Sequence, residues 1–290
     1  MKIIDFKNIK YRLIKRVEKK LKKVTSKYEE ELRLKEIERR KNRFSTSDVM
    51  IHRITKKSKL KLYKDSLLSI NIDEGFEQNE LDFLTRILSK GDTFLDIGAN
   101  IGLFSILASE LVGKTGKVIS FEPTPTTYKR LTENIRINKR ENIDARQIAI
   151  SDSSGDIDFH ISDNGNDAFN SPAQDKNGRL TSRITVPAST LDIELSKIDK
   201  SKIRFVKIDV EGWEKYVLQG ANQFLTNFSP IVMVEFTDEN VANAGYDIKE
   251  IHQQMIEYGY DWFEIYGGSL RPHTLKDKYP YENLIAIKSI

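Results

Sequence analysis

The sequence predicts an α/β fold built around a mostly parallel sheet, and three observations lead to it. From Thr93 onward, short apolar segments that suit strands alternate with segments that suit helices. Such alternation implies right-handed crossovers between parallel strands. Residues 267–283, which precede the final strand, carry no helical pattern, so we expect that strand to run antiparallel. Acidic residues also stand at or near four predicted strand ends, where open parallel sheets bind their ligands.

Residues 8–43 contain no Gly or Pro and are expected to form one long helix. Apolar residues recur along it at alternating steps of three and four, which makes a single seam. The seam consists of Ile14, Val17, Leu21, Val24 and Tyr28. We expect this helix to pack on its own domain or to pair with a second copy as a homodimer. The alternative is a basic amphipathic helix that rests on an anionic membrane surface.

The charge of the chain is unevenly distributed. Residues 1–43 hold 17 of the 47 Lys and Arg residues but only 7 of the 43 Asp and Glu residues, which leaves 30 basic and 36 acidic residues in the remainder. The main domain is therefore mildly acidic, which argues against a nucleic-acid groove there. The basic helix lacks interleaved aromatic residues, so we expect no nucleic-acid partner.

Composition excludes several other classes of protein. There are no cysteines, which rules out disulfides, thiolate nucleophiles and zinc–sulfur sites. No stretch approaches the roughly 18 apolar residues of a membrane span, and the N-terminus lacks the apolar core of a secretion signal. We expect a cytoplasmic protein, with peripheral contact at the inner membrane surface if the basic helix docks on lipid.

Two elements are expected before the alternating region. "KLKLYKD" and "SLLSINID" alternate apolar and polar residues on either side of Asp65-Ser66, which predicts a β-hairpin. "NELDFLTRILSKG" places Leu81, Leu84 and Leu88 on one helical face, and Gly91 is expected to close that helix.

The remaining elements follow in order along the chain. The expected strands are "TFLDI", "KVISFE", "ARQIAIS", "DIDFHIS", "SRITVPA", "IRFVKID", "PIVMVEF", "DWFEIYG" and "NLIAIKS". The expected helices are residues 101–112, 126–138, 213–227 and 247–258. We therefore divide the chain into a basic amphipathic helical extension (1–45), a β-hairpin linker region (46–75) and a main domain (76–290).

Four acidic residues lie at or near the ends of predicted strands, and they are Asp96, Glu122, Asp209 and Glu235. Any one of them could be a helix N-cap or a turn residue. Because the carboxyl ends of parallel strands meet at one edge of the sheet, the four together predict a ligand site.

The loop "FLDIGANIGLFS" resembles a nucleotide-binding turn without its usual glycine spacing. Gly98 and Gly102 permit a tight turn, and the helix start that follows favours an anionic group. Asn100 stands where a dinucleotide fold has its middle glycine, so close approach of a pyrophosphate is disfavoured. Asp96 suits a ligand that carries a cation, such as S-adenosylmethionine. Glu122 can accept both hydroxyls of a ribose, a role common to NAD and S-adenosylmethionine sites.

Four segments carry a family resemblance, and they are "LDIGANIGLFS", "FEPTPTTYKRLTENI", "VKIDVEGWEKYVLQGA" and "IVMVEF". In order and spacing they resemble the FkbM-type methyltransferases, a branch of the class I S-adenosylmethionine-dependent enzymes. The most distinctive part is "KIDVEGWE" followed by "VLQGA". The resemblance covers roughly residues 75–290 and leaves residues 1–60 unmatched.

The resemblance implies a seven-stranded Rossmann-like class I methyltransferase sheet with an antiparallel last strand. It implies methylation of a hydroxyl, on a sugar of a glycan or surface polysaccharide precursor, or else on a lipid or small natural product. Residues Asp96 through Gly102, including Gly98 and Asn100, would line the methionine part of S-adenosylmethionine. Glu122 would bind the ribose, and Asp152 would lie near the adenine.

The segment "KIDVEGWE" offers the groups that such a transfer needs. A sugar hydroxyl is a weak nucleophile, and a positioned base accelerates its reaction about 10²–10⁴-fold. Asp209 or Glu211 is the expected base. Alternatively, Asp209, Glu211 and Glu235 hold Mg²⁺, which would lower the pKa of the acceptor hydroxyl. A purely structural interpretation makes Glu214 and Lys207 an ion pair.

Two other functions stay open from the sequence. An NAD-dependent oxidoreductase would use a related sheet, but the missing middle glycine, Asp96 and "DVEGWE" disfavour it. A non-catalytic binding protein on the same fold would be expected to lose its acidic positions, yet Asp96, Glu122, Asp209 and Glu211 are all present.

Overall fold

The computed structural model describes residues 44–162, 170–173 and 182–289, together with Lys35, Glu38 and Asn42. The chain divides into two compact units, residues 1–48 and Val49–Ile290. The long helix expected over residues 8–43 lies almost wholly outside the described residues, although Lys35, Glu38 and Asn42 are helical. Among the helices of the described residues, none combines the length and apolar character that crossing a membrane requires.

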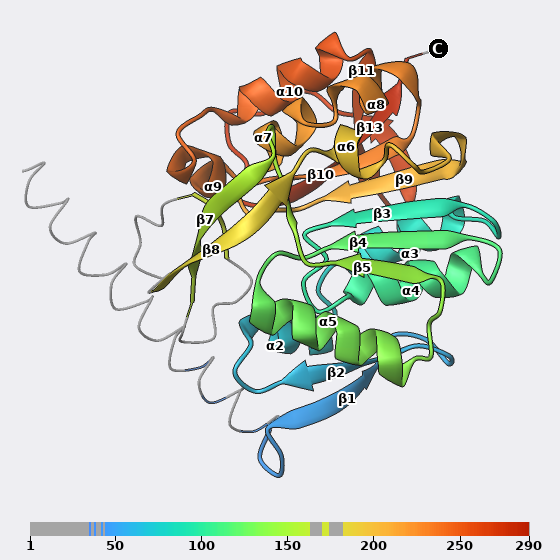
Figure 1. Ribbon diagram of the computed structural model, residues 1–290, viewed down its shortest axis with the longest axis vertical. Helices are drawn as coiled ribbons and strands as arrows, with labels where there is room; N and C mark the ends of the chain where they lie inside the picture. Colours follow the sequence, from blue (N-terminus) through green and yellow to red (C-terminus); the bar gives the residue numbers. More distant parts are fainter. Residues whose placement is uncertain are drawn as a thin grey trace, which may run out of the picture. The chain divides into compact units, whose positions relative to one another are not determined.

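An eight-stranded sheet forms the centre of the second unit (Figure 1). Its strands are β3 (Thr93–Ile97), β4 (Lys117–Phe121), β5 (Ile143–Arg146), β9 (Ile203–Ile208), β10 (Ile231–Phe236), β11 (Tyr260–Tyr266), β12 (Ser269–Pro272) and β13 (Glu282–Lys288). Their order is β12-β11-β13-β10-β9-β3-β4-β5. The order reverses between β3 and β9, which is the switch point where a ligand site is expected.

The directions of the strands confirm the predicted class I methyltransferase fold. Strands β3, β4, β5, β9 and β10 pair in parallel, whereas β13 pairs antiparallel with both β10 and β11. The last strand is therefore antiparallel, as the helix-free connection predicted. The count of seven strands needs one correction, because β12 pairs with β11 within that connection and adds an eighth strand at the edge.

Helices cover both faces of the sheet. They are α3 (Gln78–Ile87), α4 (Leu103–Val112), α5 (Pro125–Ile137), α6 (Leu191–Glu194), α7 (Glu214–Gln219), α8 (Asn222–Asn227), α9 (Asp238–Asn243) and α10 (Ile248–Glu257), with a short 3-10 turn, η2 (Lys200–Lys202). On one face, Val206 and Ile208 of β9 join a core with residues of α7, α8 and α10. On the other, Phe205 packs against Phe83 of α3. Since side chains alternate along a strand, Lys207 lies on the same face as Phe205.

The hairpin expected over residues 59–73 is wrong in its second half. β2 (Lys59–Tyr63) does form the predicted strand, but its partner is β1 (Val49–Arg53), which precedes it in the chain. "SLLSINID" instead contains a helix, α2 (Leu67–Asp73). The side chain of Ser66 caps that helix by accepting a hydrogen bond from the Ser69 N–H, which fits Ser as an N-cap residue. The alternating pattern was too short to distinguish a strand from two turns of helix.

The helix expected over residues 213–227 is divided into α7 and α8 at Gly220 and Ala221. Gly220 packs so closely on the chain that an added Cβ would lie 1.9 Å from the Ser151 carbonyl oxygen. This close approach holds the end of α7 against the segment that contains Ser151.

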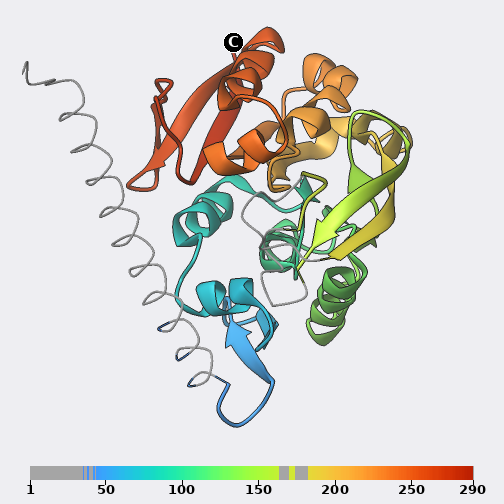
Figure 2. The same cartoon turned by 90° about the vertical axis from the view of Figure 1, so that its left-hand side faces the viewer.

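The strand pair predicted between "DIDFHIS" and "SRITVPA" forms a second, three-stranded sheet. β7 (Gly155–Ile161) pairs antiparallel with β8 (Ser182–Ser189), and β6 (Ala149–Ile150) pairs with β8 in parallel. Figure 2 shows this yellow-green sheet apart from the red C-terminal strands β11 and β13. Phe159 of β7 nevertheless reaches the wall of the cavity described below.

Candidate active site

A cavity of about 300 Å³ opens at the carboxyl ends of the parallel strands. That volume lies at the lower limit of small-molecule pockets. Its walls come from the turn between α2 and α3, the loop after β3, and the ends of β4, β9 and β10. Pro280 and Tyr281, just before β13, close another side. Segments far apart in the sequence therefore meet around one space.

Gly98 holds the loop after β3 against the end of β9. Its φ is +79°, and an added Cβ would lie 1.8 Å from the Asp209 carbonyl oxygen. The Asp209 N–H in turn donates to the Ile97 carbonyl at 3.1 Å. Only glycine fits this approach, so the sequence motif is required to bring Asp209 beside the loop.

Asp96 lies behind the cavity wall and is almost completely buried. Oδ2 accepts a 2.5 Å hydrogen bond from the Ser105 hydroxyl, while buried Oδ1 has no hydrogen-bond donor among the described residues. Burial raises the pKa of Asp96, and Lys207 and the Ser105 hydroxyl counteract part of that rise. An unpaired buried carboxylate oxygen is costly, which fits a position that requires a cationic neighbour.

Lys207 is a buried cation at the centre of the site. Its Nζ lies 2.7 Å from Asp209 Oδ2, and Asp96 is its register partner on β3. Burial alone would lower the pKa of Lys207, but the carboxylates of Asp209 and Asp96 outweigh that effect and raise it. The suggested Glu214–Lys207 ion pair is therefore wrong, since Lys207 pairs with Asp209.

Glu214 has a structural role of a different kind. Oε1 accepts hydrogen bonds from the N–H groups of Val210 and Gly212, at 3.0 and 3.2 Å. The Tyr246 hydroxyl donates to Oε2 at 3.3 Å. Burial raises the pKa of Glu214 to about 7, although the two backbone donors oppose this. Glu214 thus shapes the turn after β9 rather than pairing with a lysine.

Three carboxylates meet in the wall of the cavity, as the sequence predicted for Asp209, Glu211 and Glu235. One oxygen from each lies within 4.8 Å of the others. Asn240 donates to Glu211 Oε2 at 2.6 Å, and the Thr237 hydroxyl donates to Glu235 Oε1 at 3.0 Å. Burial, together with the charges of Glu211 and Asp209, raises the pKa of Glu235 well above its usual value. Such crowding is relieved by a proton or by a cation.

Glu122 lines the cavity after β4, but its carboxylate is largely engaged by its own chain. Oε1 accepts from the N–H and the hydroxyl of Thr124 at 3.0 and 2.5 Å, and Oε2 accepts from the Asn100 N–H at 3.1 Å. Asn100 also lines the cavity and adopts a positive φ of 47°. The Glu122 carboxylate therefore connects the two loops that a nucleoside would contact.

Three predicted cofactor-binding residues do not line the cavity, and the first of them is Asp96, which is buried behind its wall. Gly102 is the N-cap residue of α4, with φ +95°, and does not line the cavity. Asp152 is exposed after β6 and accepts hydrogen bonds from its neighbours Ser151 and Ser153. The expected roles of these three residues in holding the cofactor stay predictions.

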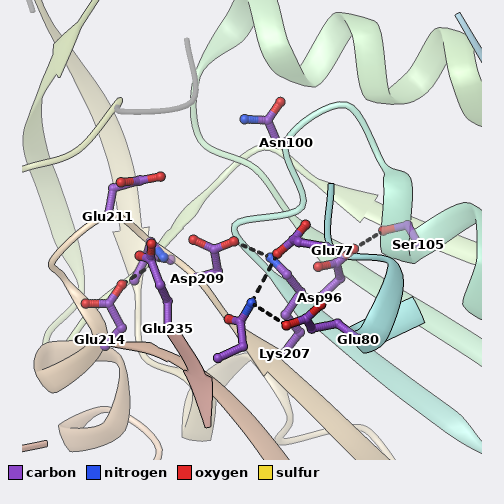
Figure 3. A network of polar contacts seen from close by, with 12 residues as sticks. Glu77, Glu80, Asp96, Asn100, Ser105, Lys207, Asp209, Glu211, Glu214 and Glu235 are labelled. Carbon is purple, nitrogen blue, oxygen red and sulfur yellow. Dashed lines mark hydrogen bonds and ion pairs between the residues drawn. The ribbon is translucent and has the colours of Figure 1, made fainter. Parts of the chain in front are cut away.

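Three functional candidates were missed from the sequence. Glu77 and Tyr281 line the cavity from opposite ends of the unit's sequence, and Asn240 positions Glu211. Figure 3 shows Glu77 beside the Lys207–Asp209 pair. Nothing in "EGFEQNE" identified Glu77, because its role depends on a turn with φ +59° between two helices.

Comparisons with known proteins agree with this geometry. The model of the Methyltransferase FkbM domain family matches residues 96–262. A second model, for protein-L-isoaspartate(D-aspartate) O-methyltransferase, matches residues 29–160. The hexuronic acid methyltransferase AglP of Haloferax volcanii is 32% identical over 184 residues, which cover 62% of this chain and 68% of that protein.

Another relative and a solved structure show the same likeness. The 2-O-methyltransferase NoeI of Sinorhizobium fredii is 29% identical over 181 residues, or 58% of this chain and 73% of that protein. A crystal structure of methyltransferase FkbM from Methylobacillus flagellatus aligns with 76% of this chain and 53% of its own, at 12% identity and a TM-score of 0.45. Because the family match extends over more than half of the chain, the protein belongs to the FkbM family of S-adenosylmethionine-dependent methyltransferases.

Proposed function

We propose that this methyltransferase methylates a hydroxyl group of a sugar, in a glycan or surface polysaccharide precursor. The main support is the meeting of Asp209 and Glu211 in one cavity with the Gly98 loop. The names of the two relatives, a hexuronic acid methyltransferase and a 2-O-methyltransferase, support the acceptor class.

The residues around the cavity fit S-adenosylmethionine better than a dinucleotide. The acidic side chains around Lys207 favour a cationic ligand, and Lys207 is the one basic side chain among the described residues that line the cavity. When bound, S-adenosylmethionine supplies an electrophilic methyl group on a sulfonium. Gly98 and Asn100 would line its methionine part, with Asp96 behind them, and Glu122 would hold the ribose.

Glu211 is the better candidate for the base. The Asp209 carboxylate already accepts a hydrogen bond from the Lys207 ammonium at 2.7 Å, and the Glu211 carboxylate accepts one from the neutral amide of Asn240 at 2.6 Å. Glu211 also adopts a positive φ of 55°, and such backbone strain concentrates at functional sites. In this proposal Glu211 takes the hydroxyl proton, and Asp209, held by Lys207, orients the acceptor.

In an alternative mechanism for the same reaction, Asp209, Glu211 and Glu235 bind a divalent cation that activates the acceptor hydroxyl. Mg²⁺ binds oxygen at about 2.0–2.1 Å, so two oxygens on one ion lie at most about 4.2 Å apart. The three carboxylate oxygens lie within 4.8 Å of one another, which is close enough for one ion to bind them after a small approach or through water. Mg²⁺ there would lower the pKa of an acceptor hydroxyl.

Methyl transfer to a panel of acceptors tests the proposal. Purified protein is incubated with methyl-labelled S-adenosylmethionine and with neutral oligosaccharides, uronic acid glycosides, lipids and small phenols. We expect label in a sugar methyl ether, identified by mass spectrometry and NMR. Two results would contradict the sugar assignment. One is methyl transfer to nitrogen, and the other is transfer to a phenol or a lipid but to none of the sugars.

The same assay tests the base. Glu211→Gln is expected to lower turnover about 10²–10⁴-fold and to leave S-adenosylmethionine affinity unchanged. Glu239→Gln is the matched control, because Glu239 lines the same cavity but is exposed and outside the carboxylate cluster. Full turnover in Glu211→Gln would remove Glu211 from the mechanism.

A further inference from the structure

The turn between α2 and α3 places an acidic side chain in the cavity. Gly75 and Glu77 both have positive φ, at 89° and 59°. A non-glycine residue in this region strains its backbone, because its Cβ lies too close to a carbonyl oxygen. Glu77 nevertheless adopts it and lines the cavity with Phe76. The turn therefore holds the Glu77 carboxylate at this position against a conformational cost.

In the part of the chain that the structure describes, only one oxygen of the Glu77 carboxylate accepts hydrogen bonds from neighbouring side chains, so the other is available to a ligand. Oε1 accepts a hydrogen bond from the Tyr281 hydroxyl at 3.1 Å and from the Asn283 amide at 3.4 Å. The Tyr281 ring also packs against Phe76, with 5.6 Å between ring centroids. Oε2 has no hydrogen-bond or ion-pair partner among the described residues. The arrangement is that of a positioned carboxylate with one free oxygen facing a cavity.

Acidic side chains far outnumber basic ones on the walls of this cavity. Among the described residues that line the cavity, Lys207 is the only cation, and Asp209 already pairs with it. Six carboxylates line the same walls, and they are Glu77, Glu122, Asp209, Glu211, Glu235 and Glu239. The site therefore has space and charge for a second cationic group close to Lys207.

We propose that Glu77 binds the ammonium group of S-adenosylmethionine. The Glu77 carboxylate, held by Tyr281 and Asn283, lies beside the Lys207–Asp209 pair (Figure 3). A hydroxyl acceptor brings no positive charge, so the cofactor's methionine end is the ligand group that corrects the imbalance. Gly98 and Ala99, which belong to the loop predicted to hold that end, line the same cavity. Burial raises the pKa of Glu77 to about 8, and Lys207 opposes that rise only in part, which agrees with a carboxylate that is short of cationic neighbours.

This inference rests on S-adenosylmethionine as the cofactor and is independent of the acceptor. The test is calorimetric binding of three compounds to wild type and to Glu77→Gln. S-Adenosylmethionine and S-adenosylhomocysteine both carry the ammonium, whereas 5′-methylthioadenosine lacks the amino-acid end. We expect Glu77→Gln to weaken the first two about tenfold and to leave the third unchanged.

Two further variants control the experiment. Glu80→Gln changes a neighbouring carboxylate that shares Asn283 but does not line the cavity, and it should bind all three compounds as wild type does. Tyr281→Phe removes a hydroxyl that holds Glu77, and it should show the selective loss to a smaller extent, which keeps the test informative if Glu77→Gln does not fold.

Three outcomes would overturn the inference. Unchanged S-adenosylmethionine affinity in both Glu77→Gln and Tyr281→Phe would do so, as would an equal loss for 5′-methylthioadenosine. The third is a loss confined to S-adenosylmethionine, which would point to the sulfonium. Failure of wild type to bind S-adenosylmethionine would instead remove the cofactor itself, so the two failures are distinguishable.

Discussion

Lys207 Nζ lies 2.7 Å from Asp209 Oδ2, two residues along the same chain, at the point where β9 ends. The lysine side chain is 4% exposed and the aspartate side chain 22% exposed. Asp96 stands beside Lys207 on the neighbouring strand. A buried cation thus holds together the acidic ends of two central strands, and the site depends on it.

Replacing Lys207 by Met should destabilise the fold by about 3 kcal/mol or more. Met has a similar length but leaves Asp209 and buried Asp96 without their cation, and breaking one partner of a buried pair costs about 3–5 kcal/mol. Urea unfolding measures the change in the free energy of unfolding. Lys202→Met is the control, because the Lys202–Asp199 pair is long and exposed and should contribute almost nothing. Equal effects of the two substitutions would show that the buried pair carries no special weight.

Gly98→Ala should be much more harmful than Gly75→Ala. Both glycines have positive φ, so both substitutions strain the backbone. Only at Gly98 does the new Cβ collide with the Asp209 carbonyl oxygen, whereas nothing lies within 4 Å of it at Gly75. We expect Gly98→Ala to cost about 3 kcal/mol more in unfolding free energy and to abolish S-adenosylmethionine binding. Similar melting temperatures for the two variants would contradict the close approach.

Cofactor binding should release a proton at pH 7. With a pKa of about 8, the Glu77 carboxyl is mostly protonated at pH 7 in the free protein. An ammonium placed beside it lowers that pKa, so the complex holds fewer protons than its parts. Affinity for the cofactor should accordingly rise with pH toward 8.

Calorimetry at pH 7 in buffers of different ionisation enthalpy measures this release. We expect close to one proton per cofactor for wild type, and close to none for Glu77→Gln. Glu80→Gln should release the same amount as wild type. A binding enthalpy that does not depend on the buffer in wild type would show that Glu77 keeps its proton.

A chelator distinguishes the mechanism in which Glu211 is the base from the mechanism that uses a divalent cation. If a divalent cation binds Asp209, Glu211 and Glu235, dialysis against EDTA should reduce methyl transfer at least tenfold, and Mg²⁺ should restore it. Glu235→Gln should then weaken Mg²⁺ binding, because it removes one of three carboxylates. Undiminished transfer after dialysis, with Glu211→Gln still inactive, would leave Glu211 as a base without metal.

Much of the main domain could be predicted from the sequence, because its strands and helices follow local patterns of apolar and polar residues. Alternating strands and helices predicted the parallel sheet, and the helix-free connection predicted the antiparallel strand β13. Asp209, Glu211 and Glu235 were expected together because each follows or ends a buried parallel strand. The errors fell on short elements, such as α2 and β12, where two turns of helix or four strand residues leave little periodic signal.

The sequence by itself determined the fold class, the family and the acidic residues at the strand ends, since these depend on periodicity and on motifs along one segment. Only the tertiary structure decided which charges meet. Lys207 pairs with Asp209 rather than Glu214 because alternation along β9 places it on the α3 side. Glu77 enters the site through a left-handed turn and is held by Tyr281, 204 residues away. Such long-range contacts leave no periodic trace in the chain, so only the folded molecule reveals them.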